Sequence, residues 1–191
     1  MDKEKIILGI DPGTSIMGFG VIKVIGKKTE LLQFGDVPFN KGDNHYQKLK
    51  AIYESVHALV DKYLPDELAV ESPFFGENVQ SMLKLGRAQG VCMTVALTKN
   101  IPVFEYSPKK IKLAITGSGN ASKEQVAGVL QSIYKIKTLP KNLDATDGLA
   151  AALCRHLNDG KDFGETETKK SPKKKSSSWD QFIKSNSDRL K

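Results

Sequence analysis

The sequence predicts an α/β fold in which a mixed β-sheet is flanked by helices. Two observations predict it. Three β-rich, apolar runs separated by turn residues occupy the first 40 residues, and helical and strand patterns alternate from about residue 46 onward. Strands joined in hairpins pair antiparallel, whereas strand–helix alternation produces parallel pairs, so the predicted sheet contains both.

The predicted elements follow in chain order. The first three strands are residues 5–10, 18–25 and 30–37, and Gly26-Lys27-Lys28 forms the hairpin turn between the last two. Apolar residues at helical spacing predict the first helix over 46–63. The later elements are a buried strand over 67–70, a long helix over 78–99, a strand over 101–104, and helices over 108–114, 122–133 and 145–157. Pro102 has no backbone N–H, so the 101–104 strand starts there or lies near an edge of the sheet.

The C-terminal part of the chain differs in composition from the rest. Residues 161–178 are mostly Lys, Ser, Thr and Glu with a single Phe, which is too little apolar surface to fold. Trp179, Phe182 and Ile183 then follow at spacing i, i+3, i+4, which permits at most a short amphipathic helix. We therefore expect a folded domain over 1–160 and a basic, disordered tail over 161–191.

Composition and charge narrow the class of protein. The 191 residues carry 29 Lys and Arg against 22 Asp and Glu, and the net charge of +7 weakly indicates a polyanionic partner. Apolar runs are far shorter than the roughly 20 residues of a membrane span, and residues 1–5 lack the apolar core of a signal peptide. Cys92 and Cys154 cannot form a disulfide framework and lack metal-site spacing. We therefore expect a cytoplasmic protein without membrane contact.

Four acidic residues stand where strands end or a helix begins. Asp11 ends the first strand, and Glu71 ends the strand over 67–70. Asp144 and Asp147 are spaced i, i+3, which places both carboxylates on one helical face. If these groups converge, like charges need a compensating cation, and oxygen ligands without His or Cys favour Mg²⁺ or Mn²⁺. A pair of such ions about 3.5–4 Å apart is the arrangement used for in-line displacement at phosphodiesters.

Each acidic residue also has a purely structural explanation. Asp11 before Pro-Gly suits a turn, and Glu71 suits the surface end of a strand. Asp144 could be a helix N-cap, and Asp147 could be a first-turn charge that favours the helix dipole.

A second class of enzyme fits the first motif. Gly-Ile-Asp-x-Gly-Thr after a strand resembles the phosphate loop of actin-like ATPases and sugar kinases, in which backbone N–H groups cradle phosphate. Those folds need two such halves around a nucleotide cleft. A domain of about 160 residues with one copy is too short for that arrangement, so we rank it low.

An ordered set of motifs identifies a more specific relationship. They are Gly-Ile-Asp-Pro-Gly at 9–13, Glu-Ser-Pro-Phe-Phe at 71–75, Asn78, Ser-Met-Leu-Lys-Leu-Gly-Arg-Ala-Gln-Gly at 81–90, Tyr-Ser-Pro-Lys-Lys-Ile-Lys at 106–112, Gly-Ser-Gly-Asn-Ala-Ser-Lys at 117–123, and Asp-Ala-Thr-Asp-Gly-Leu-Ala-Ala-Ala at 144–152. With these motifs the chain resembles the RuvC family of Holliday-junction resolvases over residues 5–158. The resemblance implies an RNase H-like fold with a five-stranded sheet, a homodimer, Mg²⁺-dependent cutting of four-way DNA junctions, and the RuvA–RuvB branch-migration complex as a partner.

The resemblance also implies roles for the acidic residues, because the family's four acidic positions fall on Asp11, Glu71, Asp144 and Asp147. Asp11 would bridge two ions, Glu71 and Asp147 would each complete the shell of one ion, and Asp144 would assist. Some members have His at the position of Asp144. The expected products are nicks with 5′-phosphate and 3′-hydroxyl ends. Two alternatives remain: a related RNase H-like nuclease acting on other branched DNA or on RNA, and a non-catalytic junction-binding module, against which the four carboxylates argue.

Basic residues flank the Gly117-Ser118-Gly119 loop, namely Lys109, Lys110, Lys112 and Lys123. A basic, flexible element beside a metal site suits contacts with phosphates, although a solvated charged face has the same composition. The resemblance favours DNA contact for Lys112 and Lys123 in particular.

Two aromatic residues, Phe74 and Phe75, follow Glu71 in a stretch with the composition of a loop. Exposed there, they would stack on unpaired bases at the centre of a junction; alternatively, the loop packs back onto the core. The resemblance points to Phe74 as the stacking residue.

The helix over 78–99 carries two apolar lines where a surface helix needs one. One runs through Val79, Met82, Leu83, Gly86, Gly90, Met93 and Leu97, and the other through Leu85, Ala88, Cys92 and Val95. A glycine inside a helix costs about 1 kcal/mol relative to alanine, so Gly86 and Gly90 indicate close backbone approach. We expect one line to contact the core and the other a partner subunit.

Overall fold

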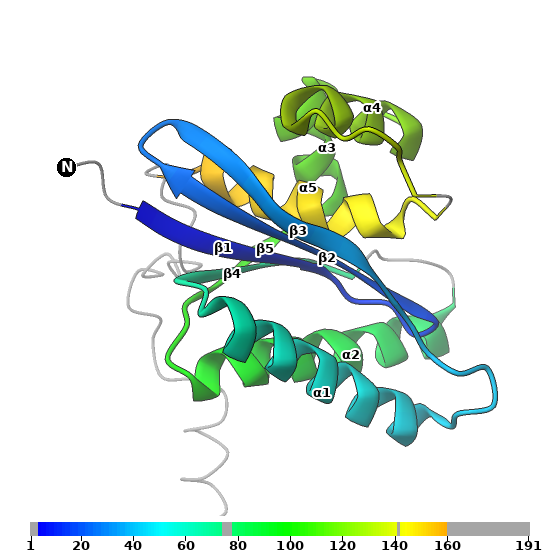
Figure 1. The fold of residues 1–191 in the computed structure, drawn as a ribbon. Coiled ribbons are helices and arrows are strands. Elements are labelled where there is room, and N and C mark those ends of the chain that lie inside the picture. The colour runs from blue at the N-terminus through cyan, green and yellow to red at the C-terminus, as the bar shows by residue number, and fades with distance from the viewer. Residues whose placement is uncertain (1–3, 74–77, 141, 160–191) are drawn as a thin grey trace, which may run out of the picture. The chain divides into compact units, whose positions relative to one another are not determined.

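The first strand of the chain lies at the centre of a five-stranded sheet whose order is β3-β2-β1-β4-β5. The computed structural model describes residues 4–73, 78–140 and 142–159. Its elements are β1 (Glu4–Asp11), β2 (Ile16–Ile25), β3 (Lys28–Pro38), α1 (His45–Tyr63), β4 (Glu67–Glu71), α2 (Val79–Thr98), β5 (Val103–Tyr106), α3 (Pro108–Thr116), α4 (Lys123–Tyr134) and α5 (Asp144–Leu157). The β1–β2 and β2–β3 pairs are antiparallel, and the β1–β4 and β4–β5 pairs are parallel. The predicted mixed sheet flanked by helices is therefore confirmed (Figure 1).

The predicted ends of the elements differ from the observed ones by up to two residues. β5 begins at Val103, so Pro102 precedes this edge strand, where its carbonyl accepts a hydrogen bond from the Leu68 N–H at 2.9 Å. β3 begins at Lys28, which leaves a two-residue turn, and Gly26 has a φ of 59°. A positive φ at the first turn residue is the pattern of a type II′ hairpin, in which glycine is favoured. The predicted tail over 161–191 lies outside the described residues and stays a prediction.

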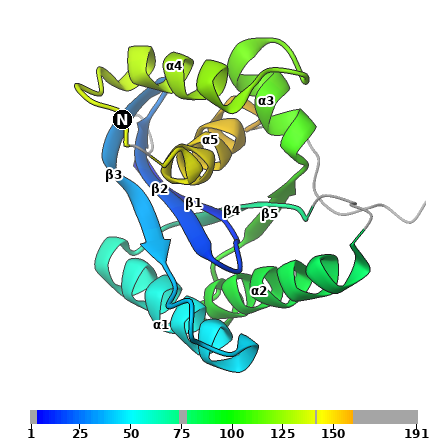
Figure 2. The same cartoon turned by 90° about the vertical axis from the view of Figure 1, so that its right-hand side faces the viewer.

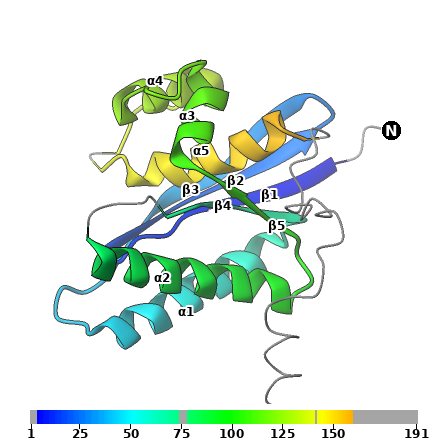
Figure 3. The same cartoon turned by 180° about the vertical axis from the view of Figure 1, so that it is seen from behind.

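Alternation along the strands divides the apolar side chains between two cores. Ile7 of β1 packs with the layer formed by α3, α4 and α5, whereas Leu8 and Ile10 pack with the layer formed by α1 and α2. Figures 2 and 3 show these two helical layers on opposite faces of the sheet. None of the described helices is long and apolar enough to cross a membrane.

α5 packs against β2 through direct backbone contact. A Cβ atom added at Gly18 would overlap the carbonyl oxygen of Asp144, and one added at Gly20 would overlap the Cα of Leu149. Both glycines lie on the same face of β2, because alternate residues of a strand share a face. Gly18 also pairs with Asp11 across the β1–β2 ladder. The contact therefore places the first turn of α5 beside the end of the central strand.

The other end of α5 is held by a buried ion pair. The Nε and Nη2 atoms of Arg155 donate to the two carboxylate oxygens of Glu67 at 2.8 and 3.0 Å. The guanidinium carbon lies 3.7 Å from the ring centroid of Phe104, and the Nζ of Lys5 lies 3.0 Å from Glu67. A bidentate ion pair of this kind fixes the orientation of the two side chains as well as the distance between them. α5 is thus anchored to the sheet at both ends.

Candidate active site

Two carboxylates come from neighbouring parallel strands whose C-terminal ends lie side by side. Asp11 is the last residue of β1 and Glu71 is the last residue of β4. The register pairs Ile10 with Val70, so each acidic residue is the next one along its strand. The carboxyl ends of parallel strands at the centre of a sheet are a common place for binding sites in α/β proteins.

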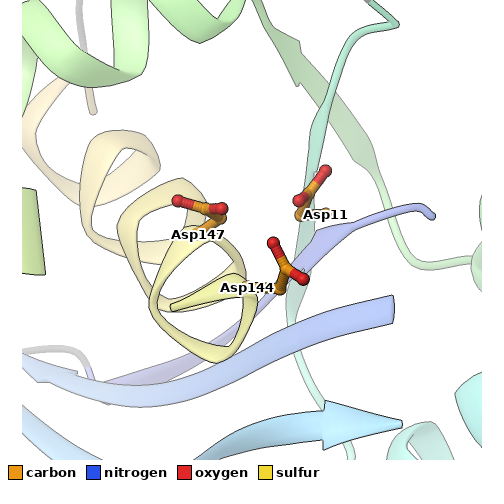
Figure 4. A group of neighbouring side chains, drawn as sticks. All are labelled: Asp11, Asp144 and Asp147. Atoms are coloured by element: carbon orange, nitrogen blue, oxygen red, sulfur yellow. The ribbon is translucent and has the colours of Figure 1, made fainter. Parts of the chain in front are cut away.

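Two more carboxylates come from the first turn of α5. The N-cap of this helix is Leu143, which makes no side-chain cap hydrogen bond, so the alternative in which Asp144 caps the helix is wrong. Asp144 and Asp147 both lie in the first turn and point toward Asp11 (Figure 4). One carboxylate oxygen from each of Asp11, Asp144 and Asp147 lies within 4.8 Å of the other two. We call these three residues the aspartate group; Glu71 lies beside it.

Burial and mutual repulsion shift the pKa values of these acids upward. Burial, and then the charge of Asp147, raises the pKa of Asp11 to about 7. Burial, and then the charges of Asp11 and Asp147, raises the pKa of Glu71 to about 8. Burial also raises the pKa of Asp147, against the effect of Lys123. Acids with these shifts bind protons or a cation in preference to remaining together as free carboxylates.

Lys123 contacts two members of the aspartate group, Asp144 and Asp147. Its Nζ lies 2.9 Å from Oδ1 of Asp144 and 2.6 Å from Oδ2 of Asp147. Burial lowers the pKa of Lys123, but the hydrogen bonds to Asp147 and Asp144 outweigh burial and raise it overall. The three carboxylates of the aspartate group could hold a metal ion, and carboxylate oxygens suit hard divalent ions.

Two cavities meet at Asp11 and Glu71, which line both. The first, of about 360 Å³, continues along Gly13, Thr14 and Ser72; we call it the hydroxyl cavity. The second, of about 560 Å³, continues along the lysines of α3 and α4; we call it the lysine cavity. The basic lining residues of the pair, Lys109, Lys112 and Lys123, all belong to the second cavity. A polyanion at the carboxylates would therefore meet ammonium groups in the lysine cavity, which Asp11, Glu71 and Asp147 also line.

The predicted DNA-contacting residues fall into three groups. Lys109, Lys112 and Lys123 line the lysine cavity. Lys110 lies over the ring of Tyr106, with its Nζ 5.0 Å from the ring centroid. Phe74, predicted to stack on bases, and Phe75 lie outside the described residues.

The structure places at the cavities four residues that the sequence motifs contain but to which they assigned no contact in the site. Thr14, Ser72 and Leu85 line the hydroxyl cavity, and Asn120 lines the lysine cavity. Thr14 directly follows the 9–13 motif that carries Asp11, and Ser72 is the residue after Glu71 in the 71–75 motif, so adjacency to the acidic residues was a usable signal. The contact of Lys123 with Asp144 and Asp147 joins residues more than 20 positions apart, and no local spacing predicts it.

An RNase H-like sheet with acidic residues gathered at the end of its central strand defines a class of nucleases. Within that class, this chain belongs to the RuvC family, since the model described as "Crossover junction endodeoxyribonuclease RuvC" matches residues 7–155. It is 57% identical to the protein of that name from Christiangramia forsetii, over 100% of this chain and 95% of the relative. It is 54% identical to the one from Bacteroides fragilis, over 99% and 97%.

A solved structure supports the same assignment. The chain is similar to RuvC of T. thermophilus in complex with Holliday junction substrate, with a TM-score of 0.74 and 31% identity over 80% of this chain and 93% of that one. The resemblance found in the sequence motifs is confirmed.

Proposed function

We propose that this protein is an endonuclease that resolves four-way DNA junctions by paired, metal-dependent nicks, in DNA recombination and repair. Each nick leaves a 5′-phosphate and a 3′-hydroxyl, ends that a ligase can seal. The observation that carries the proposal is the aspartate group beside the lysine cavity, in a chain that belongs to the RuvC family. A site for cations next to a site for phosphates is what hydrolysis of a phosphodiester requires.

We assign the metal to Asp11, Glu71, Asp144 and Asp147, with Mg²⁺ as the ion, two per site, and Mn²⁺ as a substitute. Asp11 lies next to the carboxylates of α5 and next to β4, which carries Glu71, so Asp11 would hold the metal together with both. When bound, the ions lower the pKa of a water molecule and neutralise the charge that develops on the leaving 3′ oxygen. Asp11 and Glu71 would have to be deprotonated to serve as ligands, so proton release would accompany metal binding.

The lysine cavity is the proposed place of the scissile phosphodiester. Lys109 and Lys112 from α3 and Lys123 from α4 would contact phosphates on the two sides of the cut. Lys110 would contact the strand further out, and Phe74 would stack on an unpaired base at the centre of the junction.

A nicking assay tests the proposal. A four-way junction and a linear duplex of the same sequence are incubated with the protein in Mg²⁺ or in EDTA, with Asp147→Asn as the matched inactive variant. We expect Mg²⁺-dependent nicks at the junction only, and none with the variant. Equal cutting of other branched DNA or of RNA would indicate the related nuclease, and junction binding without cutting would indicate the binding module.

We further propose that the protein acts as a homodimer through α2. In the first of the two apolar lines, Val79, Leu83 and Leu97 are 63, 50 and 57% exposed, and Met93 packs against the core. In the second line, Ala88, Cys92 and Val95 are buried. A Cβ added at Gly86 or Gly90 would meet nothing within 4 Å in the single chain. A two-fold dimer would present two active sites to the two symmetric strands of a junction.

Two further assignments complete the proposal. The RuvA–RuvB complex would be the motor that meets the protein at the junction, which co-migration on a four-way junction would test. The cytoplasm is the proposed compartment: both cysteines are free and buried, Cys154 in the core on the α5 face of the sheet and Cys92 in the core on the α1–α2 face.

A further inference from the structure

Lys123 holds two of the carboxylates that we assign to the metal. Its ammonium donates to Oδ1 of Asp144 and Oδ2 of Asp147 at 2.9 and 2.6 Å, within the range of charge-assisted hydrogen bonds. Oxygens of these two aspartates also lie within 4.8 Å of an oxygen of Asp11. The ammonium therefore occupies oxygens of two of the three carboxylates that a shared cation would bind.

The backbone that carries Lys123 is fixed, whereas its side chain is not enclosed. Lys123 is the first residue of α4, directly after the N-cap Ser122. A capping box holds that turn, because the Ser122 side chain accepts from the Gln125 N–H and the Gln125 side chain accepts from the Ser122 N–H. The Lys123 side chain is 51% exposed, so its four-carbon stem can move without disturbing the core.

The same ammonium borders the lysine cavity, together with Lys109 and Lys112. An oxygen lone pair that accepts a hydrogen bond from Lys123 cannot bind a metal ion at the same time. A divalent ion interacts with the aspartates more strongly than a single ammonium, because its charge is twice as large. An ammonium released from the aspartates remains at the rim of the cavity proposed for the phosphodiester.

We propose that Lys123 is an exchangeable counter-ion that couples metal occupancy to DNA contact. Without metal, it neutralises Asp144 and Asp147. When a divalent ion binds these carboxylates, Lys123 leaves them and becomes a phosphate contact. The inference rests on the proposed function, since it uses the same metal ligands and the same DNA cavity, and it makes Lys123 a positioning residue that competes with the metal.

Metal affinity measured in the absence of DNA tests whether Lys123 competes with a divalent ion for Asp144 and Asp147. The Kd of the full chain for Mn²⁺ is measured by electron paramagnetic resonance for the wild type, Lys123→Gln, Lys123→Arg, Lys112→Gln and Lys27→Gln. We expect Lys123→Gln to bind Mn²⁺ about fivefold more tightly, the order of effect of a partly exposed ion pair that no longer has to be broken. Lys123→Arg keeps a competing cation and stays within about twofold of the wild type.

Two variants separate exchange from a general change of charge. Lys112→Gln removes a charge that also acts on Asp147, but without a hydrogen bond to it in this structure. Lys27→Gln removes a positive charge from the β2–β3 turn, which lies at the opposite end of the β1–β2 ladder from Asp11. Both should change the Kd by less than about twofold. A Kd for Lys123→Gln equal to or weaker than that of the wild type would overturn the inference, and so would an equal gain for Lys112→Gln.

The salt dependence of junction binding tests whether Lys123 contacts a phosphate only when a divalent ion is bound. The slope of log K against log salt is compared between wild type and Lys123→Gln, in EDTA and at constant Ca²⁺. The slopes should coincide in EDTA and differ by about 0.7–0.9 in Ca²⁺, the value for one additional neutralised phosphate. The same difference in both conditions would show that Lys123 reaches DNA without exchange. If no variant binds Mn²⁺ at all, the proposed metal site fails together with the inference; equal Mn²⁺ binding by all variants defeats the inference alone.

Discussion

Asp11 takes part in every component of the proposed site, since it lines both cavities, belongs to the aspartate group and ends the central strand. We predict that Asp11→Asn, Glu71→Gln and Asp147→Asn each abolish nicking, because they remove ligand charge while keeping shape. A metal ion contributes several kcal/mol of charge stabilisation in the transition state, so the loss in rate should be on the order of 10³-fold or more. Resolution assays on a four-way junction measure it.

The same three variants should still bind the junction, or bind it more tightly, because less negative charge then faces the phosphates. Gel shifts on the same panel provide this control. Cutting at nearly wild-type rates by the carboxylate variants would contradict the metal assignment. Failure to fold, seen by circular dichroism, would instead favour a structural role for the first turn of α5.

Stability in EDTA should fall as pH rises, because of the raised pKa values of Asp11 and Glu71. The folded pKa values are about 7 and about 8, above the ordinary values near 4. Between about pH 4 and 8 these two residues therefore bind more protons in the folded state than in the unfolded state, and their contribution to the free energy of unfolding decreases as pH rises through this window.

Asp11→Asn should reduce the loss of stability at high pH, because asparagine does not ionise. We expect the variant to be more stable than the wild type at about pH 8 and to differ less from it at about pH 5, both in EDTA. Urea denaturation at the two pH values measures the difference. Asp61→Asn is the control, since a hydrogen bond from Lys99 lowers the pKa of Asp61 and its removal should not rescue stability at high pH.

At the scale of elements, the position of α5 depends on the absence of a side chain at Gly18. Gly18→Ala would place a methyl group against the carbonyl oxygen of Asp144. We predict a loss of stability of about 1–3 kcal/mol, typical of overpacking, together with weaker Mn²⁺ binding. Thermal unfolding and metal titration of one preparation measure both effects.

Gly128→Ala is the matched control for that substitution. Gly128 lies inside α4, and an added Cβ would meet nothing within 4 Å. Alanine there should stabilise the protein by up to about 1 kcal/mol and leave metal binding unchanged. Equal effects of the two substitutions would contradict the role assigned to the contact between α5 and β2.

The sequence predicted every element of the described chain because each carries its own periodicity. The ends were less certain, as at β5, where the strand pattern began two residues before the hydrogen-bonded pairs. The sequence patterns left the convergence of Asp11, Glu71, Asp144 and Asp147 as a condition, and the family resemblance supplied the reason to expect it; the structure brings Asp11, Asp144 and Asp147 together. The ion pair of Lys123 with Asp144 and the close approach of Gly18 to the Asp144 carbonyl depend on how distant segments pack, so local patterns could not predict them.

For the molecule as a whole, the exposed apolar line of α2 predicts a dimer. Light scattering at micromolar concentration should give twice the mass of the 191-residue chain, and Leu83→Asp should give the single mass. Leu83 is 50% exposed in one chain, so the substitution should leave folding intact. Leu113→Asp is the control, because Leu113 is similarly exposed, at 54%, but lies on α3. A monomeric mass for the wild-type protein, both with and without junction DNA, would contradict the predicted dimer.

The predicted tail should increase the affinity for DNA without taking part in the nicking reaction. Residues 161–191 carry nine basic and five acidic residues, a net charge of +4. Truncation after residue 160 should lower the slope of log K against log salt by about 0.7–0.9 for each phosphate that the tail neutralises in the full chain. Nicking at saturating DNA should remain. A truncated protein that binds but no longer cuts would show that the tail takes part in catalysis.

The backbone contact between β2 and α5 also determines how the gene tolerates random mutation. Side chains in a core absorb an extra methyl group by changing rotamer, but a carbonyl oxygen has no rotamer to change. At Gly18 an error in the gene therefore damages the folded state and the spacing of the aspartates at once. Purifying selection for a protein that merely folds would protect the catalytic geometry as well. A library of variants screened only for soluble expression should be depleted of substitutions at this glycine, although the screen never measures cutting.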